Sequence, residues 1–112
     1  MATPSFRHLT IDTLTTWIDA DYPLTLVDIR DPMSFAGGHI PGSRHLDNDG
    51  VPALLESAPR EQPLVVVCYH GHSSQQAAAW LAGQGFAEVY SLDGGFSEWE
   101  HRLPERVERG RP

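Results

Sequence analysis

The most constraining feature of this sequence is a short apolar run near its middle, Leu64-Val65-Val66-Val67-Cys68. Polar and apolar residues do not alternate in it, so a strand formed there must be buried on both faces. Strands of that kind occur in parallel sheets that helices cover on both sides. The run therefore predicts an α/β fold with this strand at the centre of the sheet.

Short apolar runs alternate with helical periodicity along the rest of the chain. We expect strands over residues 24–29, 44–46, 64–68 and 89–92, and helices over residues 11–18, 32–37, 51–58, 73–84 and 96–102. This alternation predicts a small doubly wound α/β domain with a central parallel sheet flanked by helices. We expect residues 1–112 to form one such domain, with a core over about 8–103 and a flexible tail over 104–112.

Local signals refine two of these helices. Thr10 is a suitable N-cap for the first helix, whose apolar residues then recur on one face. Ser73 or Ser74 can cap the helix that follows the apolar run. We expect that helix to turn Ala77, Trp80 and Leu81 towards the core.

The charge of the chain excludes several classes of function. The net charge is −7, and all eight basic residues are arginines. A chain without lysine has no Schiff-base lysine and no phosphate-binding lysine of the Walker type. An acidic chain is also a poor candidate for binding nucleic acid or anionic membranes.

The cysteine content and the amino terminus bear on the compartment. One cysteine excludes an intramolecular disulfide framework. The first residues lack the apolar core of a signal peptide, and the longest strongly apolar run, 64–69, is far too short to span a bilayer. We therefore expect a cytoplasmic protein with one free thiol.

Cys68 carries the strongest functional signal. It ends the most buried strand, and a tight loop containing Gly71 leads from it into a helix. Such a loop can point several backbone N–H groups at one spot, where the helix N-terminus adds positive partial charge. These groups would stabilise a bound anion or the cysteine thiolate itself, which is the reactive form.

Three alternatives stay open on the residues alone. Cys68 could be a small hydrophobic core residue that ends a strand. Cys68, His70 and His72 could bind zinc, although one-residue spacing and the lack of a second ligand cluster argue against it. A cysteine phosphatase or arsenate reductase would need a cation in the loop to hold the oxyanion, and 68–76 contains no arginine.

Three segments together resemble the rhodanese-like domain family, and within it the single-domain thiosulfate sulfurtransferases. Residues 27–43, VDIRDPMSFAGGHIPGS, are similar to the first signature of the family. Residues 68–74, CYHGHSS, are similar to its active-site loop, and residues 89–99, VYSLDGGFSEW, to its carboxyl-terminal signature. With a first helix at 11–18, the resemblance spans nearly the whole chain.

The resemblance implies sulfur transfer by double displacement. Cys68 would attack the outer sulfur of thiosulfate, release sulfite and hold a persulfide. A thiophilic acceptor would then take the sulfur: cyanide in an assay, and a cellular thiol, dithiol or protein thiol in the cell. The resemblance implies no metal and no organic cofactor.

The resemblance also assigns roles to single residues. The loop residues Tyr69, His70, Gly71, His72, Ser73 and Ser74 would bind the substrate anion and the persulfide. Asp28, Arg30, Gly94 and Gly95 would be structural, the first two through ion pairs and hydrogen bonds. His39 would be a buried, hydrogen-bonded residue.

The chain departs from the family in one respect. Many members carry arginine or lysine in or just after the loop, whereas here Gln75 follows the serines. We therefore expect weak binding of thiosulfate. The alternative function is a sulfur-carrier or regulatory rhodanese module that passes persulfide sulfur between protein partners.

Overall fold

A computed structural model describes residues 5–110 of the chain. Residues 1–4 and 111–112, which belong to the amino-terminal stretch and the tail considered above, lie outside the described residues. The strands are β1 (Arg7–Leu9), β2 (Thr25–Asp28), β3 (Arg44–His45), β4 (Leu64–Val67) and β5 (Val89–Leu92). The helices are α1 (Ile11–Asp19), α2 (Pro32–Gly37), α3 (Val51–Ser57), α4 (Ser73–Ala82) and α5 (Gly95–Arg102), with 3-10 turns η1 (Asn48–Gly50) and η2 (Pro104–Arg106).

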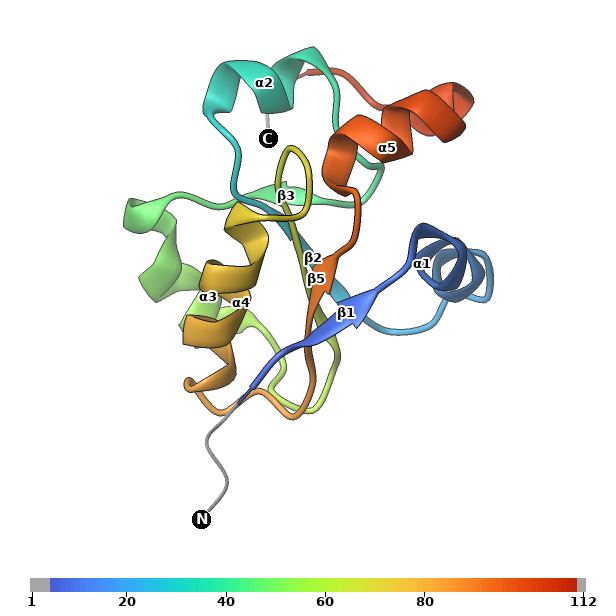
Figure 1. Ribbon diagram of the computed structural model, residues 1–112. Helices are drawn as coiled ribbons and strands as arrows, with labels where there is room; N and C mark the ends of the chain where they lie inside the picture. Colours follow the sequence, from blue (N-terminus) through green and yellow to red (C-terminus); the bar gives the residue numbers. More distant parts are fainter. Residues whose placement is uncertain (1–4, 111–112) are drawn as a thin grey trace.

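The five strands form one parallel sheet in the order β1-β5-β4-β2-β3. β4 lies at its centre, and all four of its residues are buried. Figure 1 shows α3 and α4 on one side of the sheet and α1 and α5 on the other. The predicted α/β class with a central parallel sheet is therefore confirmed.

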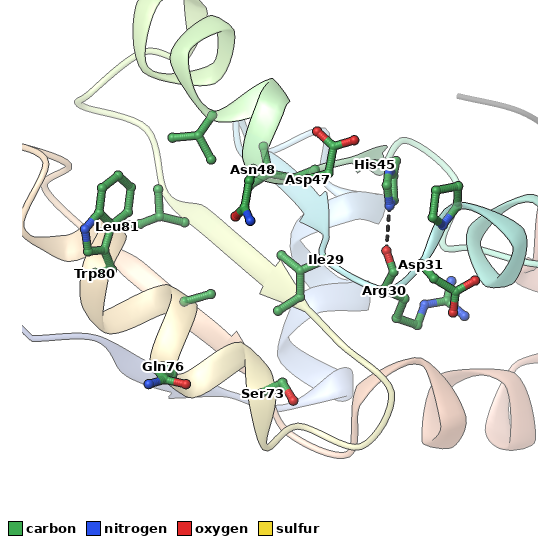
Figure 2. Close-up of a pocket in the computed structure, with 14 residues that line it drawn as sticks. Ile29, Arg30, Asp31, His45, Asp47, Asn48, Ser73, Gln76, Trp80 and Leu81 are labelled. Carbon is green, nitrogen blue, oxygen red and sulfur yellow. Dashed lines mark hydrogen bonds between the residues drawn. The ribbon is translucent and has the colours of Figure 1, made fainter.

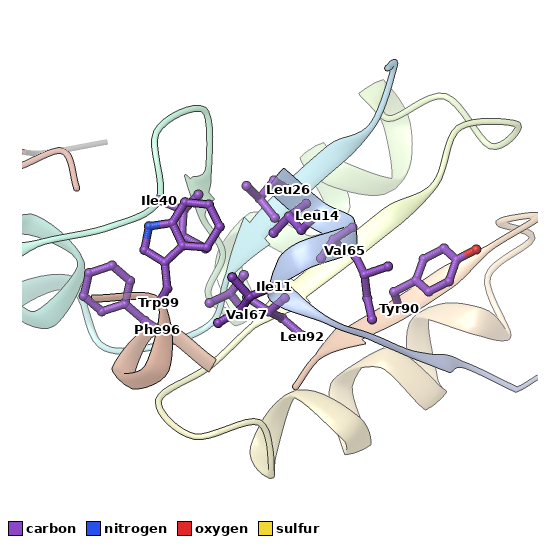
Figure 3. Packing of buried hydrophobic residues seen from close by; sticks show 11 residues of the cluster. Ile11, Leu14, Leu26, Ile40, Val65, Val67, Tyr90, Leu92, Phe96 and Trp99 are labelled. Atoms are coloured by element: carbon purple, nitrogen blue, oxygen red, sulfur yellow. The ribbon is translucent and has the colours of Figure 1, made fainter. Parts of the chain in front are cut away.

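Side chains of β4 alternate between the two helical layers. Val65 and Val67 belong to a cluster that includes residues of α1 and α5. Leu64 and Val66 belong to a second cluster, which includes residues of α3 and α4. Figure 3 shows the first cluster, with Trp99 and Phe96 projecting from α5. The lack of alternation in this apolar run thus reflects burial on both faces.

Two details of α4 differ from expectation. The helix begins at Ser73, and neither that serine nor Ser74 caps it: His72 occupies the N-cap position without a side-chain cap bond. The Ser74 hydroxyl instead contacts Cys68 and Ser91. Trp80, expected to face inward, is 52% exposed, because its position on the helix faces the rim of a surface cavity rather than the sheet.

The expected flexible tail is packed where the structure describes it. His39 and Glu108 exchange two backbone hydrogen bonds of 2.8 and 2.9 Å, and Gly110 N–H donates to the Ala36 carbonyl. The Trp99 indole N–H donates to the Arg106 carbonyl at 2.7 Å. The segment pairs with residues about seventy positions earlier, so no local sequence pattern predicts its order. Strand β1 was likewise not predicted, because it has only three residues and two of them are exposed.

The two tryptophans Trp99 and Trp80 provide a matched test of this packing. We predict that Trp99→Ala, at a fully buried position, lowers the free energy of unfolding by about 3–5 kcal/mol. Trp80→Ala, at a half-exposed position, should change it by about 0.5 kcal/mol. Urea unfolding of both variants measures the difference, and equal losses would contradict the assignment of Trp99 to the core.

Candidate active site

Cys68 lies directly after β4, at the carboxyl edge of the sheet. The loop that follows it, residues 69–72, passes between α2 and α5 before entering α4 (Figure 1). This edge is where parallel α/β sheets bind their ligands. The Cys68 side chain itself is only 2% exposed.

Hydrogen-bond donors surround the sulfur of Cys68. The backbone N–H groups of Gly71 and Ser74 donate to Sγ at 3.1 and 3.2 Å. The Ser74 hydroxyl lies 3.2 Å from the same atom. We call this arrangement the sulfur cup: Cys68 Sγ with the Gly71 N–H, the Ser74 N–H and the Ser74 hydroxyl.

The sulfur cup makes Cys68 more acidic than an ordinary cysteine. Burial is the largest single influence, and it raises the pKa of the thiol. The Ser74 hydroxyl and the backbone N–H groups of Ser74, Gly71 and His70 lower it. Together these donors outweigh burial, so the net pKa of Cys68 is lowered. A thiol of this kind keeps more of its reactive thiolate as the pH falls.

Close contact with the start of α5 shapes the loop. The N–H groups of Phe96 and Ser97 donate to the carbonyls of Cys68 and Tyr69 at 2.8 and 2.9 Å. Gly95 makes this approach possible: its φ is +61°, and a Cβ there would lie 2.5 Å from the Cys68 oxygen. The carbonyls are therefore held on the α5 side, away from the sulfur cup.

Two other glycines complete the turn geometry. Gly71 has φ +90°, and an added Cβ would lie 2.9 Å from the Gly94 nitrogen. Gly94 itself has φ +79°. Within the described residues, the N–H groups of His72 and Ser73 have no protein acceptor, so they are available to an incoming anion.

Asp28 and Arg30 form a buried ion pair beside the loop. The Arg30 Nη2 atom lies 2.7 Å from Asp28 Oδ2 and also donates to the Gly38 carbonyl at 2.6 Å. The guanidinium lies 4.2 Å from the centre of the Phe96 ring on α5. Arg30 therefore ties β2, the end of α2 and α5 together, and its charge is already paired.

The remaining predicted loop residues point outwards. Tyr69, His70, His72 and Ser73 are exposed, whereas Gly71 and Ser74 are buried. His39 is buried, contacts the Phe35 carbonyl at 2.8 Å and stacks on the Phe35 ring. The structure thus brings Gly71 and Ser74, but not the two loop histidines, into the sulfur cup.

Asp31, which the sequence did not single out, holds the start of the loop. It caps α2 by accepting from the Ser34 N–H at 2.8 Å, and it accepts a hydrogen bond from the Tyr69 hydroxyl. Donation by the Tyr69 and Ser34 hydroxyls and by the Ser34 N–H holds the pKa of Asp31 well below its usual range. The sequence signal was Asp31 before Pro32, which is typical of a helix start.

Two cavities flank the loop. The larger, about 710 Å³, has Trp80, Gln76 and Ser73 of α4 along one side and Asp47 and Asn48 on the other (Figure 2). The smaller, about 320 Å³, is lined by Tyr69 and His70 of the loop together with residues of α2 and α5. Cys68 lines neither cavity.

Over residues 5–110, no group of three or more His, Cys, Asp or Glu side chains is placed to hold a metal ion. Nor does this part of the chain contain a helix long and apolar enough to cross a membrane.

Comparison with known proteins decides the family. A model of the rhodanese-like domain matches residues 10–102. The chain belongs to the rhodanese-like domain family. The resemblance of the three sequence segments is thereby confirmed.

Curated relatives and solved structures agree with this assignment. A thiosulfate sulfurtransferase GlpE from Stutzerimonas stutzeri is 64% identical over 83 residues, covering 74% of this chain and 76% of that protein. The GlpE of Ectopseudomonas mendocina is 60% identical over 85 residues, covering 76% of this chain and 78% of that protein. The crystal structure of a rhodanese-like domain protein from Staphylococcus aureus has a TM-score of 0.78 at 25% identity and covers 93% of this chain and 98% of its own.

A more distant structure supports the fold alone. The crystal structure of the Alr3790 protein from Anabaena has a TM-score of 0.80 at 24% identity. It covers 91% of this chain and 80% of its own.

The contact between Gly95 and the loop generates a matched prediction. Gly95→Ala should lower the free energy of unfolding by about 1–3 kcal/mol, since its Cβ would collide with the Cys68 carbonyl at a positive φ. Gly37→Ala is the control, because a Cβ there has nothing within 4 Å. Thermal and urea unfolding measure both, and a neutral Gly95→Ala would contradict the close contact.

Proposed function

We propose that this chain is a thiosulfate sulfurtransferase that works through a persulfide on Cys68. The observation that carries the proposal is the sulfur cup. It surrounds the one cysteine of the chain with hydrogen-bond donors, which lower the pKa of that cysteine. The names and high identities of the GlpE relatives support the same reaction.

The first half-reaction forms the persulfide. The Cys68 thiolate attacks the outer sulfur of thiosulfate and forms a new S–S bond. The S–S bond within thiosulfate breaks, and its electron pair leaves with sulfite. The N–H groups of His72 and Ser73, together with the loop residues Tyr69 and His70, would receive the anion and the developing charge.

The second half-reaction returns the thiolate. An acceptor attacks the outer sulfur of the persulfide, and the bonding pair returns to Cys68, where the cup donors stabilise it. Cyanide would yield thiocyanate, and a thiol would yield a new persulfide. Because the chain holds one cysteine, no second thiol of its own can resolve the persulfide. The acceptor must come from outside, and we propose a thiol, dithiol or protein thiol of the cytoplasm, with no metal or organic cofactor.

A second candidate is a persulfide carrier that acts between protein partners. The charge around the loop favours it: Arg30 is paired with Asp28, and the loop itself has no arginine or lysine. A thiosulfate dianion therefore meets little positive charge near the site. In this candidate function the sulfur donor is a protein persulfide, and thiosulfate is incidental.

Intact mass tests the shared intermediate. Incubation with thiosulfate should add one sulfur atom to the chain, and cyanide should then remove it as thiocyanate. Cys68→Ser should gain no sulfur, because it lacks the nucleophile. Ser57→Ala, which removes an exposed hydroxyl on α3, is the control and should behave as the parent.

The outcomes separate the proposals. Absence of both the adduct and thiocyanate would sink the thiosulfate reaction. A persulfide formed only from a protein persulfide donor would select the carrier function instead.

The missing loop cation predicts weak binding of thiosulfate. KM should be high, because the loop contains no arginine or lysine and the net charge of the chain is −7. Steady-state kinetics on the parent protein measure KM, and a low value would contradict the prediction.

A further inference from the structure

Ser91 is a polar side chain buried within an otherwise apolar layer. It lies on β5 and pairs with Val66 of β4. Its strand neighbour two positions earlier, Val89, packs in the cluster beneath α3 and α4. The Ser91 side chain shares that face of the sheet, and the residue is 0% exposed. A hydroxyl in such a layer is costly unless it has a hydrogen-bond partner.

The partner of Ser91 is a member of the sulfur cup. The Ser91 and Ser74 hydroxyl oxygens lie 2.7 Å apart, and the Ser74 hydroxyl lies 3.2 Å from Cys68 Sγ. Among the described residues, the Ser91 hydroxyl has no other hydrogen-bond partner. Cys68, Ser74 and Ser91 therefore form a buried chain of three groups joined by two contacts.

The number of protons that these three groups share favours one direction of hydrogen bonding among them. With a thiolate at Cys68, two hydroxyl protons serve two contacts: Ser91 donates to Ser74, and Ser74 donates to sulfur. With a neutral thiol, Cys68 Sγ instead donates to the Ser74 hydroxyl oxygen, and three protons compete for the same two contacts. The backbone N–H groups of Gly71 and Ser74 already point at sulfur, which further favours sulfur as the acceptor.

We propose that Ser91 is a positioning residue, which orients the Ser74 hydroxyl as a donor to the Cys68 sulfur and so favours the reactive thiolate. Its relevance to turnover rests on the proposed function. The orientation itself can be measured without any sulfur transfer. Neither Ser91 nor its strand belongs to the loop that would receive the substrate.

Several charged or titratable groups lie in the loop and in the elements next to it. They are His70 and His72 of the loop, the Asp28–Arg30 pair after β2, and Asp93 and Glu98 at the junction of β5 and α5. All of them remain in every variant considered below. A change between variants therefore reports the hydroxyl chain and not these charges.

Alkylation of Cys68 by iodoacetamide tests the proposal, since the chain has no other thiol. The rate is followed by intact mass as a function of pH. In Ser91→Ala the midpoint of the profile should move to higher pH, and the rate below that midpoint should fall about three- to tenfold. The rate at high pH, where the thiol is fully ionised, should stay close to that of the parent. Ser91→Thr, which keeps a hydroxyl, should retain the parent midpoint.

Two comparisons separate positioning from simple loss of packing. Val89→Ala removes apolar volume from the same face of β5; it should lower the melting temperature without moving the midpoint. In a Ser74→Ala background, Ser91→Ala should have no further effect, because Ser91 acts through Ser74. If Ser91→Ala does not fold, Ser91→Val set against Ser91→Thr compares the same shape with and without the hydroxyl.

The contrary results are equally definite. A Ser91→Ala profile that coincides with the parent would overturn the proposal. So would a shift of the same size in the Ser74→Ala background. If the alkylation profile does not shift but the persulfide still forms, the sulfurtransferase function holds and the role of Ser91 is wrong. If the profile shifts but no persulfide forms, the role of Ser91 holds and the sulfurtransferase function is wrong.

Discussion

The contact between the start of α5 and the loop after β4 is the constraint on which the candidate site depends. Two N–H groups of α5 bind the carbonyls of Cys68 and Tyr69. Gly95 allows this close approach, since a Cβ there would lie 2.5 Å from the Cys68 oxygen. The two contacts fix the peptide units that carry the Tyr69 and His70 N–H groups, and the His70 N–H is one of the donors that lower the pKa of Cys68. They also anchor the first part of the loop, whose later N–H groups, those of Gly71 and Ser74, donate to Sγ. The active-site loop (68–74) and the carboxyl-terminal signature (89–99) thus form one structural unit.

The same geometry explains how a buried thiol becomes acidic without a neighbouring cation. Burial alone would raise the pKa of Cys68, yet the net direction is downward because several donors converge on Sγ. Arg30, a cation beside the loop, forms a buried ion pair with Asp28 and so stabilises the scaffold. The negative charge on the Cys68 sulfur is therefore stabilised by oriented N–H and O–H dipoles and not by a cation. Such dipoles stabilise a thiolate and a persulfide alike, whereas they attract a distant dianion only weakly.

Sequence patterns predicted the parts of this structure that are governed by local chemistry or by burial. The apolar run ending at Cys68 indicated the central strand, and the strand–loop–helix context indicated a cradle for an anion. The order of the tail and the exposure of Trp80 could not be predicted, because they depend on contacts between distant segments. Ser91 lies within the carboxyl-terminal signature, but the sequence predicts no role for it, since its partner Ser74 lies seventeen positions away. Its burial on β5, which only the structure shows, is the observation that singles it out.

Direct titration of the Cys68 thiolate tests the central claim, that the sulfur cup outweighs burial. The ultraviolet absorbance of the thiolate is measured against pH, with Cys68→Ser as the blank for the other chromophores. Net stabilisation predicts a midpoint below that of an unperturbed cysteine, about pH 8.5. It also predicts that acid removes the contribution of the thiolate to folding stability as the pH falls through this lower midpoint. A midpoint at or above that of a free cysteine would show that burial dominates, and it would contradict the activation of Cys68 by the loop.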